Sequence, residues 1–311
     1  MNERRKRPHA GRGNSLSRSL AGGVFAFLLC ATAHAQQSPQ AHFHHVHLNS
    51  TDPAAAIDFY STKFKARKEK FAGLVDAVWT GDSWLLFTKV ASPPSELISG
   101  IWHIGWGAED MQSTYAKQVD SGTTFATPIT DISEMVGGNR PFFYAYVEGP
   151  DHALIELNTA RHHDFGHVHL FSADPPAAGE WYAKHFGWRA VAQKDKREFR
   201  GNPIGPAAFV TADHVSMIFY PIEHVQKNAP DAWQNRSGFA TTRGRVIDHL
   251  GFSVADLDAT LDRLRQSGVT VTAEPQDIAG GGLRYAFIEG PDQVAIELLE
   301  DRSPQPAPIT Q

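Results

Sequence analysis

Short apolar stretches separated by turn residues recur along most of the chain, and four of them follow one pattern. Each begins at a histidine, reaches an aspartate seven residues later and continues into a segment whose apolar residues have helical spacing. In the first of these segments, Ile57, Tyr60 and Phe64 fall on one face of such a helix. Strand-like stretches divided by turns such as Gly149-Pro150-Asp151 come next, so each unit is predicted to fold as βαβββ.

The aspartates of the four units are predicted to cap helices. A side-chain oxygen at the N-cap accepts a hydrogen bond from a free backbone N–H of the first helical turn. Pro53 and Pro175 directly follow two of these aspartates, where a first-turn proline is tolerated. The four pairs of histidine and aspartate are His45 with Asp52, His103 with Asp110, His167 with Asp174, and His249 with Asp256.

Internal repetition divides the sequence into two related halves. Residues 45–64 match residues 167–186 at 11 of 20 positions, and residues 144–157 match residues 285–298 at nine of 14. The expected domains are residues 42–160, which hold the first two units, and residues 164–301, which hold the last two. A flexible tail is expected at residues 302–311.

The N-terminus has the pattern of a secretory signal peptide. Basic residues at 4–7 precede an apolar stretch from Leu20 to Ala33, and Ala33-His34-Ala35 forms a cleavage signal. Removal of residues 1–35 would give a periplasmic or secreted protein that has lost its single cysteine, Cys30, and is not held at a membrane. The remaining 23 Lys and Arg against 33 Asp and Glu disfavour nucleic acid as a partner.

The motifs of the four units resemble those of the vicinal-oxygen-chelate superfamily, which includes glyoxalase I, methylmalonyl-CoA epimerase, bleomycin-resistance proteins and extradiol dioxygenases. These motifs are a histidine that opens the first strand (HVHLNSTD, HIGWGAED, HVHLFSAD, HLGFSVAD) and a Gly-Pro-Asp turn before a glutamate in the last strand. The resemblance covers nearly all of residues 42–301. It implies an α+β fold in which four βαβββ modules pair into two cupped mixed β-sheets with helices outside.

Carried onto this sequence, the resemblance implies two metal sites of two histidines and one glutamate each. Imidazole and carboxylate ligands suit a divalent first-row metal, and a glutamate between apolar neighbours is costly to bury without a cation. The alternative is that these are solvent-facing strand residues or the remains of a lost site. The expected ligands are His45, His103 and Glu156 in the first site, and His167, His249 and Glu297 in the second.

A fourth protein ligand, which the resemblance places at the end of the odd-numbered modules in four-ligand isomerases, is not expected here. Two histidines and one carboxylate form a facial triad that leaves three positions of an octahedral ion open, which suits oxygen chemistry. Fe(II) is therefore the favoured metal, with Zn, Ni or Mn as alternatives. The positions without a usual ligand are Leu86, Phe87, Thr88, Met217, Ile218 and Phe219.

Five further residues are candidates for catalytic roles. His47 and His169 each lie two residues after an expected ligand, on the same face of the strand. They act either as general acid or base, or only line the cup. Tyr144, Tyr146 and Tyr285 precede the glutamates on a neighbouring strand, where they either hydrogen-bond an oxygen intermediate or pack in the core.

The remaining positions concern space and access. Gly105 and Gly251 are expected to leave room for a ligand, and His44 is expected to be solvated. Phe287 replaces Tyr146 in the second half, which suggests that the two sites are not equally active. The longer spacing between the histidines of the second half predicts an extra loop near residues 221–245, which either covers the second site or is exposed to solvent.

These features support three hypotheses about function. The leading one is an extradiol-like dioxygenase that oxygenates a small catechol-like substrate. The second is a glyoxalase-like lyase or isomerase that acts through a chelated enediolate. The third is a protein that binds and sequesters a small molecule, as bleomycin-resistance proteins do. Each hypothesis implies a small-molecule partner, and the chain is expected to be a monomer or a homodimer.

Overall fold

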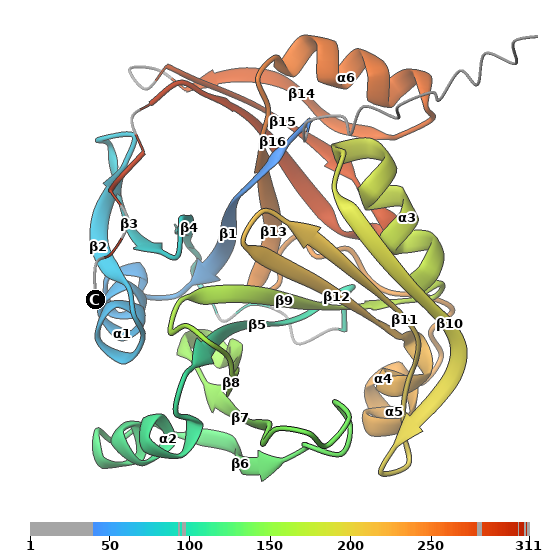
Figure 1. Ribbon diagram of the computed structural model, residues 1–311. Coiled ribbons are helices and arrows are strands. Elements are labelled where there is room, and N and C mark those ends of the chain that lie inside the picture. The colour runs from blue at the N-terminus through green and yellow to red at the C-terminus, as the bar shows by residue number, and fades with distance from the viewer. Residues whose placement is uncertain are drawn as a thin grey trace, which may run out of the picture. The chain divides into compact units, whose positions relative to one another are not determined.

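The computed structural model of the protein describes residues 40–92, 94, 98–278, 282–303, 305–307 and 309 (Figure 1). These residues belong to one compact unit. The predicted signal peptide, residues 1–35, lies outside the described part of the chain. Within the described part, no helix is long and apolar enough to cross a membrane.

The predicted order of strand, helix and three strands is confirmed in the first half of the chain. Module 1 consists of β1 (His42–Ser50), α1 (Pro53–Lys63), β2 (Arg67–Phe71), β3 (Val75–Thr80) and β4 (Ser83–Lys89). Module 2 consists of β5 (Ile101–Ala108), α2 (Met111–Asp120), β6 (Phe125–Asp131), β7 (Phe143–Glu148), the short 3₁₀ turn η1 (Pro150–His152) and β8 (Leu154–Thr159).

The second half repeats this order. Module 3 consists of β9 (Phe165–Ser172), α3 (Pro175–Phe186), β10 (Arg189–Phe199), β11 (Asn202–Ala212) and β12 (Val215–Pro221). Module 4 consists of β13 (Ile247–Ser253), α6 (Leu257–Gln266), β14 (Val271–Ile278), β15 (Leu283–Glu289), the 3₁₀ turn η2 (Pro291–Gln293) and β16 (Ala295–Asp301). Two short helices, α4 (Ile222–Asn228) and α5 (Pro230–Trp233), lie between the two modules.

All four predicted aspartate caps are present. The carboxylate of Asp52 accepts a hydrogen bond from the backbone N–H of Ala55 at 3.1 Å, which satisfies a free donor of the first turn of α1. Asp110, Asp174 and Asp256 accept the same bond from the residue three positions later. The caps therefore set the point at which each helix begins after the first strand of its module.

The two sheets do not follow the two halves of the sequence. One eight-stranded sheet has the order β14-β15-β16-β13-β1-β4-β3-β2, and the other has the order β10-β11-β12-β9-β5-β8-β7-β6 (Figure 1). Module 1 therefore pairs with module 4, and module 2 pairs with module 3. The ligand sets expected from the sequence implied that modules pair within residues 42–160 and within residues 164–301, and this pairing is wrong. All four first strands carry a similar apolar pattern, so the pattern does not specify which of them pair.

Antiparallel pairs of first strands join the modules in each sheet. β1 pairs with β13, with His47 opposite His249, and β5 pairs with β9, with His103 opposite His169. Within each module, the first strand runs parallel to the last strand. Each sheet is thus mixed, as predicted, and histidines from two modules meet at its centre.

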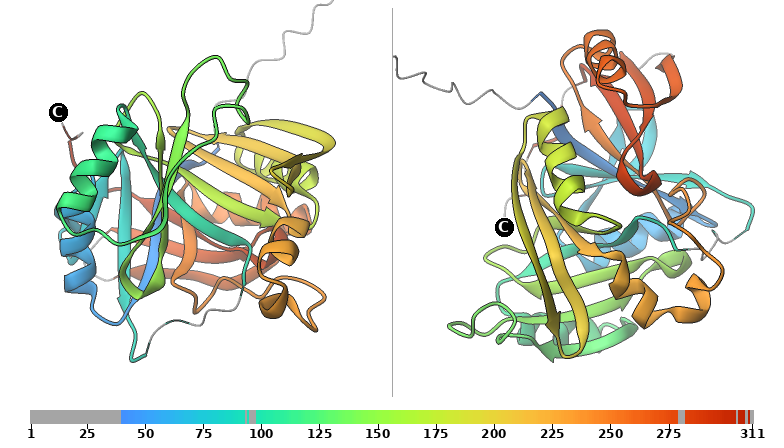
Figure 2. Two further views of the ribbon diagram at one scale, coloured as in Figure 1. Left: turned by 90° about the horizontal axis from the view of Figure 1, so that it is seen from below. Right: turned by 90° about the vertical axis from the view of Figure 1, so that its right-hand side faces the viewer.

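The face of each sheet opposite these histidines forms a shared hydrophobic core. Side chains alternate along a strand, so Val46 and Leu48 of β1 point away from the neighbouring histidines and are buried in this core. Phe43 of β1 and Phe165 of β9 have ring centroids 6.0 Å apart, so the two sheets contact each other through this face. The helices cover it as well: α3 packs on β10 and β11, and α6 on β14 (Figure 2).

The Gly-Pro-Asp turns link the modules of each half. Asp151 in η1 has a φ of 52°, and its carboxylate accepts hydrogen bonds from Ser50 Oγ at 2.7 Å and Thr51 Oγ1 at 2.6 Å in module 1. Asp292 in η2 has a φ of 58° and accepts a hydrogen bond from the backbone N–H of Ala173 in module 3 at 3.0 Å. Each turn therefore connects to the preceding module in addition to leading into the glutamate strand.

Two connecting segments differ from expectation. The extra segment at residues 221–245 contains α4 and α5 rather than loop alone. The expected flexible tail makes defined contacts over its described residues, because Trp84 Nε1 donates a hydrogen bond to Gln305 Oε1 at 3.0 Å and Ile309 packs on a cluster that includes Phe71. The chain thus returns to module 1 near its C-terminus (Figure 1).

We predict that neither half of the chain folds as a monomer when expressed alone, because each sheet needs one module from each half. Co-expression of residues 37–161 with residues 162–311 should give a soluble complex of one copy of each. Size-exclusion chromatography with light scattering would detect it. A folded, monomeric single half would contradict the sheet pairing.

Candidate metal centres

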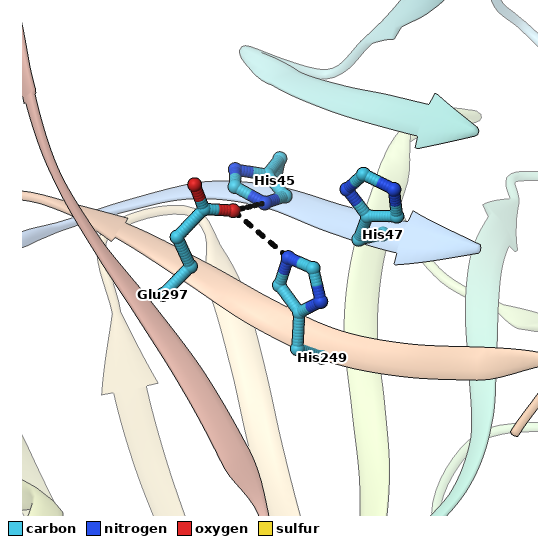
Figure 3. Close-up of side chains that lie close together, drawn as sticks. All are labelled: His45, His47, His249 and Glu297. Carbon is cyan, nitrogen blue, oxygen red and sulfur yellow. Dashed lines mark hydrogen bonds and ion pairs between the residues drawn. The ribbon is translucent and has the colours of Figure 1, made fainter. Parts of the chain in front are cut away.

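Four side chains of ligand type meet on the cupped face of the first sheet, and we call this group the first centre. His45 and His47 come from β1, His249 from β13 and Glu297 from β16, and one ligand atom of each lies within 4.8 Å of the others. The Nε2 atoms of His249 and His45 lie 2.8 Å and 3.2 Å from Oε2 of Glu297 (Figure 3). Two histidine rings therefore converge on one carboxylate oxygen.

The second sheet holds an equivalent group, which we call the second centre. It consists of His103 from β5, Glu156 from β8, and His167 and His169 from β9, again with ligand atoms within 4.8 Å of one another. His103 Nε2 lies 3.0 Å from Oε2 of Glu156, and His167 Nε2 lies 3.6 Å from Oε1. All four side chains are buried.

All six expected ligand residues lie in the two centres, but the expected sets are wrong. The sequence placed His45 with the module 2 residues His103 and Glu156, and His167 with the module 4 residues. In the structure His45 and His167 exchange places, because module 1 pairs with module 4 and module 2 with module 3. Each centre therefore takes its side chains from both halves of the chain.

Two glycines make space for histidine rings, and the expectation that they leave room for a ligand is wrong. Gly251 lies between His45 and Glu297 across three adjacent strands, and Gly105 has the same position in the second centre. A Cβ atom on Gly251 would lie 1.9 Å from the ring of His45, and one on Gly105 would lie 2.0 Å from the ring of His167. The absence of a side chain lets each ring reach across to the glutamate.

The glutamates of both centres are buried anions. Burial alone would raise the pKa of Glu297, but the hydrogen bond from His249 and the nearby ring of His45 hold this pKa well below its usual range. Burial is opposed in the same way at Glu156, where the hydrogen bond from His103 and the nearby histidines lower the pKa. Each carboxylate therefore stays charged at neutral pH in a buried position, where a cation stabilises it.

The first ligand histidine of each centre offers a free nitrogen to such a cation. Burial lowers the pKa of His45 and of His167 to about 4, so both rings are neutral at pH 7. Their Nε2 atoms are buried and form no hydrogen bond within the described residues, although each lies close to a carboxylate oxygen. A neutral imidazole nitrogen beside a carboxylate suits a divalent metal, so the residues of both centres fit one.

His47 and His169 lie within the centres, on the face that strand alternation predicted. The ring of His47 stacks on His249 with centroids 4.5 Å apart, and His47 Nε2 forms a 2.7 Å hydrogen bond with Thr88 Oγ1. His169 stacks on His103 at the same distance, 4.5 Å. Burial lowers the pKa of both rings well below the usual range, and Nδ1 of each is buried without a partner in the described structure.

Of the three candidate tyrosines, two lie in the second sheet. Tyr146 is the cross-strand neighbour of Glu156, and its ring lies 5.0 Å from that of His103. Burial raises the pKa of Tyr146 well above its usual range, so its hydroxyl keeps its proton. Tyr144 contacts Tyr146 edge-on at 5.2 Å and lies one step further from the histidines.

The first sheet lacks an equivalent hydroxyl beside its ligands. Phe287 occupies the position of Tyr146 and lies 5.0 Å from the ring of His249. The hydroxyl of Tyr285 donates a hydrogen bond to Gln276 Oε1 at 2.8 Å on the neighbouring strand. A protonated hydroxyl therefore lies beside the ligand residues of the second centre in Tyr146, whereas the hydroxyl of Tyr285 is engaged away from the first centre.

Two residues that directly precede ligands were missed by sequence analysis. His44 was expected to be solvated, but it is buried and its Nδ1 lies 2.9 Å from Nδ1 of His45. Asp248 accepts a hydrogen bond from His249 Nδ1 at 2.7 Å. In a regular strand, neighbouring side chains point to opposite faces. Both residues, however, are extra residues at register shifts between β1 and β13, and such bulges re-aim a side chain.

The inserted helix α4 adjoins the second centre. The ring of His224 in α4 lies 5.0 Å from that of Trp102, which lies 4.4 Å from that of His103. Trp102, His224 and Phe171 also line a cavity of about 360 Å³. This volume is sufficient for a small organic molecule, and the segment at residues 221–245 forms part of its wall.

The two halves of the chain each match one family of known proteins. Residues 42–157 and residues 164–298 match the model of the Glyoxalase/Bleomycin resistance protein/Dioxygenase superfamily. The lactoylglutathione lyase of Haemophilus influenzae is 38% identical over 60 residues, which make up 19% of this chain and 44% of that protein. The matched segments span less than half the length of the curated relatives.

Solved structures share the fold over most of the chain. Glyoxalase I from Zea mays has a TM-score of 0.63 at 12% identity, covering 84% of this chain and 93% of that one. A Bacillus subtilis protein whose name proposes a dioxygenase has a TM-score of 0.59 at 14% identity, covering 86% and 87%. At these identities the likeness establishes the fold and does not separate a lyase from an oxygenase.

We predict that Gly251→Ala and Gly105→Ala each remove one bound metal ion per chain. The added methyl group would displace the ring of His45 or His167, and overpacking of this kind lowers the free energy of unfolding by about 1–3 kcal/mol. Elemental analysis and chemical denaturation would measure the two effects. Gly238→Ala is the matched control, because no atom lies within 4 Å of a Cβ there. Unchanged metal content in both glycine variants would contradict the assignment.

Proposed function

Because the chain belongs to the Glyoxalase/Bleomycin resistance protein/Dioxygenase superfamily, we propose that it is a metal-dependent lyase or isomerase of the glyoxalase type. One observation carries the proposal: each cup holds a buried carboxylate beside a buried imidazole nitrogen that has no hydrogen-bond partner in the described structure. The substrate is a small molecule with two adjacent oxygen atoms. Zn, Ni or Mn is the expected metal.

The sequence favoured a dioxygenase, whereas the names of the curated relatives favour a lyase. The curated relatives are named lactoylglutathione lyases. A lyase or isomerase of this class moves a proton between adjacent carbon atoms and needs no oxidant. When bound, the metal would hold both substrate oxygens and stabilise negative charge on them, which makes the neighbouring C–H acidic.

His47 and His169 are the proposed bases for this proton transfer. When the Nε2–H of His47 donates a hydrogen bond to Thr88 Oγ1, the free lone pair of the ring is on Nδ1. Nδ1 would then take up the substrate proton and return it to the adjacent carbon. Burial keeps both rings neutral at pH 7, the state that a base requires. At the second centre, Tyr146 is the proposed hydrogen-bond donor to a substrate oxygen.

An extradiol-like dioxygenase is the second candidate, and one observation favours it. If His47 and His169 stay off the metal, each centre supplies two histidines and one carboxylate, the facial triad of non-haem Fe(II) oxygenases. Catechol-like substrates would then be expected. Sequestration of a small molecule without catalysis is the third candidate.

We predict about two metal ions per chain in protein purified without added metal, and one fewer in each of Glu156→Ala and Glu297→Ala. Glu289→Ala, which changes an exposed glutamate on β15, is the matched control. Isomerisation of 2-oxoaldehydes, with and without added thiols, is followed alongside oxygen uptake with catechols. Zn, Ni or Mn with isomerisation supports the proposal. Iron together with oxygen uptake would instead support the dioxygenase. Absence of metal from every preparation would support the third candidate, a protein that binds a small molecule without catalysis.

In proteins with one centre left, His47→Gln (in the Glu156→Ala background) and His169→Gln (in the Glu297→Ala background) are predicted to lower kcat by about 10²- to 10⁴-fold, the usual contribution of a general base. Metal content should stay at the level of each background, because the ligand histidines are intact. Steady-state kinetics and elemental analysis check the two parts. Loss of metal in either variant would show that the histidine is a fourth ligand, and an unchanged kcat in both would exclude the proposed base.

We also propose that residues 1–35 direct export and are then removed. The basic residues, the apolar stretch and the Ala33-His34-Ala35 cleavage signal support this proposal. N-terminal sequencing of the protein recovered from the periplasm or medium should begin at Gln36. Recovery of the intact N-terminus from the cytoplasm alone would contradict it.

A further inference from the structure

The two centres share one backbone plan but differ in the residues at their β-bulges. In the β1–β13 pair, the extra residues are His44 and Asp248, and each directly precedes a ligand histidine. The β5–β9 pair has bulges at the equivalent positions, where the extra residues are Gly166 and Trp102. The bulges therefore present two polar side chains at the first centre. At the second centre, the equivalent bulges present the indole of Trp102 and, at Gly166, no side chain.

Asp248 holds His249 in a fixed orientation. Its Oδ1 accepts a hydrogen bond from His249 Nδ1 at 2.7 Å, which leaves Nε2 directed into the centre. The side chain of Asn49 and the backbone N–H of Gly244 donate to Oδ2 at 2.9 Å and 2.7 Å, and Arg243 Nη1 lies 2.9 Å from Oδ1. The carboxylate is thus itself held in place by three neighbours.

A second chain of hydrogen bonds fixes His45. Oδ2 of Asp301 accepts from His44 Nε2 at 3.2 Å, and His44 Nδ1 lies 2.9 Å from His45 Nδ1. With its proton on Nε2, His44 accepts at Nδ1 from the Nδ1–H of His45. The lone pair of His45 is then on Nε2, which faces Glu297. Both ligand histidines of the first centre are therefore held in one orientation, with Nε2 directed at Glu297.

The second centre lacks these outer partners. Nδ1 of His103 is buried without a hydrogen-bond partner among the residues described, and its ring lies 4.4 Å from that of Trp102. Gly166 has no side chain to offer the ligand that follows it. The outer contact is made to the carboxylate instead, because Asn158 Nδ2 donates to Glu156 Oε1 at 2.7 Å. This bond withdraws negative charge from the carboxylate that would help to hold a metal.

We propose that the first centre binds its metal more tightly than the second, with Asp248 and His44 as positioning residues. The inference rests on metal binding in the proposed function. A hydrogen bond at the outer nitrogen orients a ligand ring and increases its basicity, and loss of such a partner typically weakens metal binding by 10- to 100-fold. The expected Kd for Zn²⁺ is therefore at least about tenfold lower at the first centre.

The test compares single-centre proteins by titration of Zn²⁺ against a chromogenic chelator. Glu156→Ala leaves the first centre intact, and Glu297→Ala leaves the second. Asp248→Asn keeps the size and an acceptor oxygen but removes the charge. It should raise the Kd about 10- to 100-fold in the Glu156→Ala background and less than about twofold in the Glu297→Ala background. Asp277→Asn, which changes an exposed carboxylate on β14, is the matched control and should alter neither Kd.

Three further measurements test the outer contacts and separate positioning from folding. Asn158→Leu, which introduces the residue type found at the equivalent position 299, should lower the Kd of the second centre in the Glu297→Ala background. Absorption spectra of the Co²⁺-loaded proteins should change on Asp248→Asn at the first centre only, while denaturation of the metal-free proteins reports on folding. Equal Kd values at both centres, or an effect of Asp248→Asn at both or neither, would overturn the proposal. No Zn²⁺ binding in either background would overturn metal dependence itself.

Discussion

The burial of one charged carboxylate in each sheet is the constraint on which the rest of the architecture depends. Glu297 is 8% exposed and Glu156 is 7% exposed, and an ionised carboxylate at such depth is costly unless positive charge or hydrogen-bond donors meet it. The histidines that meet each glutamate come from neighbouring strands of the same sheet. A glycine must also stand beside each glutamate, since any Cβ at Gly251 or Gly105 would occupy the space of the approaching ring.

This requirement explains why the junction between modules is the functional part of each sheet. The first strands of two modules lie antiparallel, so a histidine from one strand faces a histidine from the other, as His47 faces His249. The last strand of one of the two modules runs parallel to its first strand and places the glutamate beside these histidines. The opposite face of the same strands is apolar and joins the two sheets through contacts such as Phe43 with Phe165, so one strand serves both the core and the centre.

The local features of this fold could be predicted from the sequence, because they depend on residues close together in the chain. The module order and the aspartate caps follow from the spacing of motifs, and His47 and His169 follow from strand alternation. The six ligand residues follow from the resemblance of these motifs to those of a known superfamily. Which modules pair could not be predicted, since the four first strands carry a similar pattern. The pairing of module 1 with module 4 also depends on contacts more than 200 residues apart, such as that of His45 with Glu297. His44 and Asp248 were missed because a bulge breaks the alternation on which the prediction relied.

The pairing across halves gives a bound metal a structural role that a centre built within one half would not have. The first centre joins His45 of the first half to Glu297 of the second, and the second centre joins Glu156 to His167 in the same way. A metal that binds only the folded chain stabilises it by mass action, by about 2.7 kcal/mol when its free concentration is 100 times Kd. Because both centres bridge the halves, this free energy opposes separation of the halves as well as disorder within either sheet. Metal affinity and the integrity of the paired sheets are therefore one linked property of the molecule.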